Sequence, residues 1–158
     1  MSKLPSKFNE TLVLLAEKLE GKQYAIRGTA SLVLQGLDFN VADIDVVCDE
    51  ETAKFVSDEV KYIESDKFKS FFGKFIVNGI DVEVMGNWQI KNSKGEWSRV
   101  FDGSERTSVE VGGREIFVTT LESELSMFLF MERWNAYHKL KKLIELRDAN
   151  QLELFNPA

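Results

Sequence analysis

Three short stretches of the sequence hold residues whose types and spacing could do chemistry: Gly28-Thr29, Asp43-Ile44-Asp45 and Glu83. Thirteen residues separate Thr29 from Asp43, which is enough for one short helix and a return loop. Side chains at positions i and i+2 of a strand share a face, so we expect Asp43 and Asp45 to point the same way. If the strand around Glu83 lies beside them, three carboxylates converge on one patch.

The negative charge of such a patch indicates which chemistry it could support. Crowded carboxylates repel one another unless a cation lies among them. Oxygen ligands at this density suit Mg²⁺ or Mn²⁺, with water and substrate phosphates completing the coordination. A glycine lets the backbone approach a phosphate, and the free N–H groups at a helix start attract anions. A metal site next to a phosphate cradle predicts phosphoryl or nucleotidyl transfer.

Hydrophobic periodicity and turn signals predict the elements that must position these residues. Asp49 is a suitable helix N-cap, and Asn78-Gly79 fits a two-residue type I′ hairpin turn. A long loop is expected over Trp88–Arg106. We predict a mixed α+β domain with helices over 8–19, 30–37, 50–60 and 121–148 (broken near Asn135), and strands over 24–26, 44–47, 75–77, 80–84, 108–111 and 115–118.

Length and charge narrow the function further. A chain of 158 residues suits one domain, here 1–158. Its 26 acids and 20 bases give a net charge of −6, which argues against clamping a long nucleic acid. A single cysteine, Cys48, excludes an internal disulfide framework and predicts a small, packed apolar side chain. Without a leader pattern or a membrane-length apolar run, a cytoplasmic protein is expected.

The ordered motifs resemble the signature of the nucleotidyltransferase superfamily, which has a DNA polymerase β-like fold. Gly28-Thr29, then Asp43-Ile44-Asp45-Val46, then Val82-Glu83-Val84 carry the resemblance, which covers Tyr24–Gly86. The stretch Phe75–Gly86 looks closest to short stand-alone prokaryotic nucleotidyltransferase-like proteins. The resemblance implies a short mixed sheet packed with helices, and a C-terminal helix that closes the core.

The resemblance also implies roles for individual residues. Asp43 and Asp45 would hold two divalent ions, Mg²⁺ or Mn²⁺, that bridge the triphosphate of an NTP, expected to be ATP. Glu83 would complete the metal site and help to deprotonate an acceptor hydroxyl on a small molecule or protein. A nucleoside monophosphate would be transferred and pyrophosphate released.

Phosphate binding is implied for the residues around the first motif. Gly28 and Thr29 would grip the β and γ phosphates, and Ser31 would add a hydroxyl contact. The position before Gly28 is usually apolar in the superfamily but is Arg27 here. At a strand end, Arg27 could either pair with a carboxylate or reach the phosphates.

A second interpretation comes from residues that the sequence lacks. Many relatives carry lysines along the C-terminal helix, whereas the corresponding stretches here read Phe128-Leu129-Phe130-Met131 and Asn135-Ala136-Tyr137. The alternative is a catalytically weak nucleotide-binding or interaction module, such as the antitoxin half of a toxin–antitoxin pair. Under either interpretation, a homodimer or partner chain could supply a wall for the acceptor.

Overall fold

The computed structural model describes residues 5–155, with side chains described as far as Gln151. Within these residues, five helices and seven strands follow one another along the chain. Their bounds are α1 Ser6–Lys18, β1 Tyr24–Arg27, α2 Gly28–Leu34, β2 Ile44–Cys48, α3 Glu50–Val56, β3 Lys61–Glu64, β4 Phe68–Val77, β5 Ile80–Ile90, β6 Arg106–Val111, β7 Arg114–Thr119, α4 Leu121–Phe130 and α5 Trp134–Phe155.

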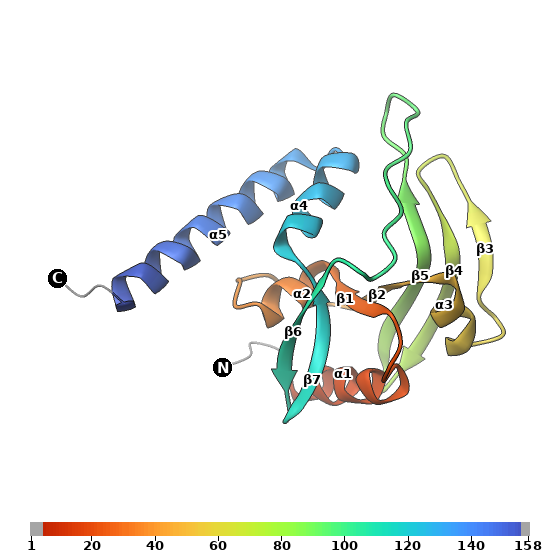
Figure 1. Ribbon diagram of the computed structural model, residues 1–158, viewed down its shortest axis with the longest axis horizontal. Coiled ribbons are helices and arrows are strands. Elements are labelled where there is room, and N and C mark those ends of the chain that lie inside the picture. The colour runs from red at the N-terminus through yellow and green to blue at the C-terminus, as the bar shows by residue number, and fades with distance from the viewer. Residues whose placement is uncertain (1–4, 156–158) are drawn as a thin grey trace.

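The strands form one mixed sheet in the order β3-β4-β5-β2-β1-β7-β6 (Figure 1). β2 runs parallel to β5, and β1 runs parallel to β7, while the remaining neighbours are antiparallel. The far arm of the Asn78-Gly79 hairpin therefore lies beside the strand that follows Asp43, as the sequence predicts. This adjacency brings the second and third motifs together.

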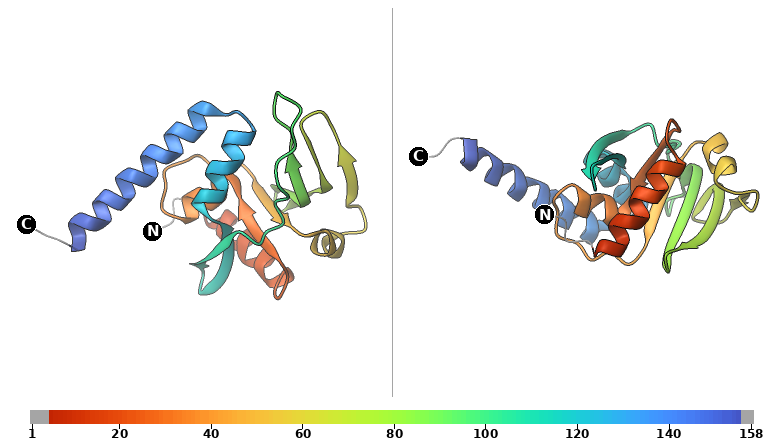
Figure 2. Two further views of the ribbon diagram at one scale, coloured as in Figure 1. Left: turned by 45° about the horizontal axis from the view of Figure 1, so that its top comes forward. Right: turned by 90° about the horizontal axis from the view of Figure 1, so that it is seen from below.

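Helices cover both faces of the sheet. Because side chains alternate along each strand, successive residues pack against opposite layers of helices. On β1, Ile26 packs with α1 and α3 on one face, whereas Ala25 packs with Met127 of α4 on the other. Figure 2 looks onto α1 from below, where it lies across the strands. Leu140 of α5 is fully buried with Leu32 and Phe128, so the C-terminal helix closes the core as expected.

Several local predictions are confirmed. Asn78 and Gly79 have φ values of 53° and 75°, which the type I′ turn requires. The Asp49 side chain accepts a 2.8 Å hydrogen bond from the Thr52 N–H and caps α3. Cys48 is fully buried in the core. The long C-terminal helical pattern breaks between Phe130 and Trp134, just before the expected Asn135.

Other predictions need correction. The sequence analysis missed β3, an edge strand whose residues are largely exposed, so its apolar residues do not alternate clearly. β5 continues to Ile90, so the expected long loop begins inside a strand. α2 begins two residues earlier than predicted, at Gly28, and α3 ends at Val56 rather than Val60. None of the helices between residues 5 and 155 combines the length and apolar content that a bilayer-spanning helix needs.

Candidate active site

A row of four charged residues crosses the face of the sheet that α4 covers. Arg27 on β1 is paired with Asp45 on β2, Asp45 with Glu83 on β5, and Glu83 with Lys74 on β4. Directly paired residues share a face of a sheet, so the four side chains lie side by side. Asp43 lies just before β2, outside the strand, and is half-buried. The structure thus places Asp45 of β2 beside Glu83, with Asp43 just before the strand.

Asp45 is the most perturbed carboxylate of this row. Its pKa is raised from 3.8 to about 6, mainly by burial and also by the neighbouring Asp43 and Glu83 carboxylates, while Arg27 opposes the rise. Its Oδ2 lies 3.4 Å from Nη1 of Arg27, and the Asp45 side chain is 18% exposed. Its Oδ1 is buried without a hydrogen-bond donor. Asp45 therefore sits in a place that favours an additional positive charge.

Arg27 is the counter-ion that this site already holds. Besides the Asp45 ion pair, its guanidinium lies 4.4 Å from the ring centre of Trp88, and Nη1 lies 3.9 Å from the Met85 sulfur. The Arg27 side chain is 12% exposed, and its Nε has no hydrogen-bond partner. Of the two roles open for Arg27 from the sequence, the structure shows pairing with a carboxylate.

Gly28 approaches Asp45 so closely that a side chain there would be crowded. Its φ is +74°, and a Cβ atom would lie 3.2 Å from Oδ2 of Asp45. A glycine is therefore required both by the backbone conformation and by the carboxylate. Thr29 follows at the start of α2 and is half-buried.

Glu124 on α4 is a functional candidate that the sequence analysis missed. It is fully buried, accepts a 2.8 Å hydrogen bond from the Gly28 N–H and also accepts one from the Thr119 hydroxyl. Burial raises the pKa of Glu124 above its usual range. An acid in the first turn of a helix is common at surfaces, so nothing in the local sequence distinguishes it. Glu124 ties the Gly28 loop to α4.

Ser31 does not face the charged row. It is fully buried, and its hydroxyl lies 3.2 Å from the Thr119 hydroxyl and 3.0 Å from Nε2 of Gln35. The hydroxyl is therefore used for packing α2 against β7. The expected contact between Ser31 and a nucleotide stays a prediction.

The three carboxylates at this site fit a divalent cation by chemistry, although they are not arranged around one. Within residues 5–155, no three carboxylate, imidazole or thiol groups are already placed as ligands of a common metal ion. Asp43, Asp45 and Glu83 nevertheless supply oxygen donors, and the unpaired Oδ1 of Asp45 is the kind of atom that a cation stabilises. Side-chain rotation would be needed to bring the three onto one ion.

Comparisons with known proteins agree with this architecture. No protein-family model and no curated protein matches the chain, whereas solved structures do. A proposed nucleotidyltransferase from Thermotoga maritima is 29% identical, with a TM-score of 0.73 over 90% of this chain and 95% of its own. The lincosamide antibiotic adenylyltransferase LnuA, solved with lincomycin bound, is 15% identical, with a TM-score of 0.52 over 92% and 98% of the two chains. The chain therefore has a nucleotidyltransferase-like fold, as the motifs predict.

Proposed function

We propose that the protein is a metal-dependent nucleotidyltransferase that moves a nucleoside monophosphate from an NTP to a hydroxyl group. The observation that carries the proposal is the side-by-side placement of Asp45 and Glu83 next to Gly28, within a nucleotidyltransferase-like fold. ATP is the proposed donor. A small molecule or a protein side chain is the proposed acceptor, since the net charge of −6 disfavours long nucleic acids.

In the reaction, the acceptor oxygen attacks the α-phosphorus, the bond to the β-phosphate breaks, and pyrophosphate leaves with the electron pair. Glu83, a half-buried carboxylate beside Asp45, would take the hydroxyl proton. Asp43 and Asp45 would hold Mg²⁺ or Mn²⁺, which when bound neutralises the phosphate charge. The backbone at Gly28-Thr29 would approach the triphosphate.

The Arg27 side chain must move away from Asp45 for this reaction to proceed, because its guanidinium neutralises the Asp45 carboxylate that a metal would use. A bound triphosphate offers Arg27 an alternative anionic partner. We therefore infer that Arg27 turns from Asp45 toward the phosphates when the metal and the nucleotide enter together.

The experiment that tests the proposal follows the α-phosphate of labelled ATP in the presence of Mg²⁺. We expect label to be transferred slowly to water or to the protein, with pyrophosphate rather than phosphate released. Glu83→Gln should reduce the release by about a hundredfold, the range of general-base catalysis. Asp81→Asn is the matched control, since Asp81 is an exposed acid two residues earlier on β5. Release of phosphate instead of pyrophosphate would contradict the proposal. An equal loss of pyrophosphate release in Glu83→Gln and Asp81→Asn would contradict it as well.

A second function is favoured by one observation, the Arg27–Asp45 ion pair. An internal cation in the metal position suits a fold that binds a nucleotide or a partner without turnover, such as an antitoxin-type module. If this second function holds, the parent protein should release no pyrophosphate from ATP, whereas Arg27→Ala should strengthen metal-dependent ATP binding.

A further inference from the structure

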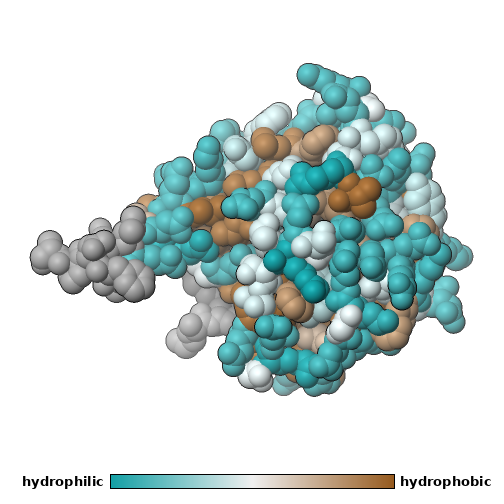
Figure 3. All heavy atoms as spheres, in the orientation of Figure 1, coloured by the Kyte–Doolittle hydropathy of each residue, from teal (hydrophilic) through white to brown (hydrophobic). Residues whose placement is uncertain are grey.

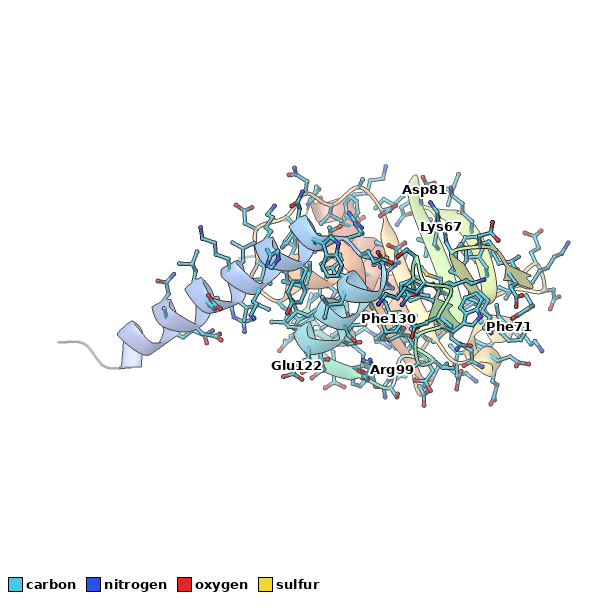
Figure 4. The ribbon with its side chains drawn as sticks, turned by 90° about the horizontal axis from the view of Figure 1, so that it is seen from above. Lys67, Phe71, Asp81, Arg99, Glu122 and Phe130 are labelled. Carbon is cyan, nitrogen blue, oxygen red and sulfur yellow. The ribbon has the colours of Figure 1, made fainter. Side chains whose placement is uncertain are left out.

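A large cavity opens between the α4–α5 turn and the far end of the β3–β4–β5 region. Its volume is about 870 Å³, within the range of small-molecule sites. Phe130 and Met131 line one side, and Phe68, Trp88 and Ile90 line the other. Figure 4 shows Phe130 on α4 and Lys67 at the β3–β4 turn, both of which line this cavity. These five apolar side chains, three of them aromatic, share the lining with charged and polar residues, among them Lys91, Glu132 and Arg133.

A β-bulge creates the aromatic floor of the cavity. Phe71 pairs with Gly86 and Lys69 pairs with Gln89, so Ser70 on β4 faces two residues of β5. The additional residue, Asn87, has a φ of 48°. The bulge shifts the side-chain alternation and turns Trp88 onto the face that carries Glu83 and Met85. Trp88 then packs with Phe101 and Met127.

A polar bridge fixes the two walls relative to each other. Oε1 of Glu132, in the α4–α5 turn, accepts a 2.5 Å hydrogen bond from the Ser93 N–H, and Oε2 accepts a 2.9 Å bond from the Ser93 hydroxyl. Glu132 has a left-handed backbone, with a φ of 57°, and both Glu132 and Ser93 line the cavity. The cavity is therefore a built feature rather than a loosely packed gap.

The floor of the cavity is in contact with the charged row. Trp88 lies under the Arg27 guanidinium, and Arg27 pairs with Asp45. A molecule on Trp88 is therefore separated from Asp45 by a single side chain, and this side chain is the one that turns away when a nucleotide enters.

We propose that this cavity binds the acceptor, a hydroxyl-bearing small molecule with an apolar ring, and that Trp88, Phe130 and Met131 hold the ring. The identification of the bound molecule as the acceptor rests on the proposed function, whereas the binding of a ring-bearing molecule in the cavity does not. The aromatic side chains in the lining favour a ring over an open polar chain, and the volume is in the range of small-molecule sites.

The test uses the methionine methyl groups as reporters in the full chain. Met131 lines the cavity, whereas Met127 is buried away from its lining. The probes are phenyl, 4-nitrophenyl and 4-methylumbelliferyl β-D-glucosides, and methyl β-D-glucoside serves as the ringless control. We expect at least one aryl glucoside at millimolar concentration to shift the NMR signal of Met131, identified with Met131→Leu, while methyl glucoside leaves it unchanged.

Two variants locate the binding. Phe130→Ala should weaken the aryl glucoside by about tenfold, as expected for losing one aromatic contact. Leu129→Ala is the matched control, because Leu129 is adjacent on α4 but is not part of the cavity lining. Failure of every aryl glucoside to move Met131, an equal response to methyl glucoside, or equal weakening in both variants would overturn the proposal. Aryl glucoside binding without any nucleotide binding would leave the cavity site in place and reject the proposed reaction.

Discussion

At the scale of single residues, Asp45 determines how the candidate site responds to pH. Its pKa is about 6 in the folded protein and 3.8 for an unperturbed side chain. The folded protein therefore binds this proton more tightly than the unfolded chain does. The contribution of Asp45 to the free energy of unfolding therefore falls as the pH rises from about 4 to about 6, by about 3 kcal/mol in total. A carboxylate that costs this much to ionise is typical of functional sites.

The prediction is that Asp45→Asn stabilises the protein at high pH. At about pH 8, the free energy of unfolding should rise by up to about 3 kcal/mol, because the amide carries no buried charge. At about pH 4, where Asp45 is protonated in the folded state, the variant and the parent should be nearly equal. Urea unfolding of the variant and the parent at the two pH values measures both differences in the free energy of unfolding. A variant less stable than the parent at high pH would show that ionised Asp45 contributes to folding.

A second residue-scale prediction concerns Arg27. Because its positive charge opposes the rise in the Asp45 pKa, Arg27→Met should raise that pKa above its present value of about 6. Arg27→Lys retains the charge and should produce a smaller increase. Carbon-detected NMR titration of the aspartate carboxyl groups measures the change. An unchanged or lowered pKa in Arg27→Met would mean that the ion pair does not govern this carboxylate.

At the scale of elements, the important connection runs from α4 to the loop at Gly28. Glu124 makes it by accepting hydrogen bonds from the Gly28 N–H and from the Thr119 hydroxyl at the end of β7. Three elements thus meet at one buried side chain. The position of Gly28 beside Asp45 depends on this meeting.

We expect Glu124→Ala to lower the free energy of unfolding by about 2–4 kcal/mol, since it leaves two donors unpaired and a cavity behind. Glu124→Gln keeps an acceptor oxygen and the side-chain volume, so its cost should stay below about 1 kcal/mol. Chemical denaturation of the two variants measures the difference between their free energies of unfolding. Equal losses in the two variants would show that the hydrogen bonds to Gly28 and Thr119 contribute nothing measurable.

Sequence patterns could predict the elements with strong local signals but not the contacts that depend on packing. The Asn78-Gly79 turn and the strand after Asp43 were predicted from local signals, whereas the pairing of β2 with β5, on which the meeting of Asp45 and Glu83 depends, is a long-range contact. The bulge at Asn87 was missed, because no local pattern shows an additional residue in one strand. The burial of Ser31 could not be predicted from the sequence, because the rotation of α2 is set by its packing against β7.

At the scale of the whole molecule, the two faces of the sheet differ in the side chains that they carry. The face under α1 is a continuous apolar core, whereas the face under α4 carries the charged row and the aromatic cavity. Figure 3 shows a largely hydrophilic surface with apolar atoms along the first part of α5. The homodimer or partner chain expected from the sequence stays a prediction, which sedimentation of the purified chain can test.

The central claim is that the charged row binds a metal together with a nucleotide. The most direct measurement is a thermal-shift titration with each NTP, with and without Mg²⁺. A ligand that binds the folded state stabilises it by about 2.7 kcal/mol at a hundred times its dissociation constant. We predict a rise in melting temperature that requires both ATP and Mg²⁺ and is absent in Asp45→Asn relative to its own ligand-free baseline. No rise with any NTP at millimolar concentration, or an equal rise in Asp45→Asn, would contradict it.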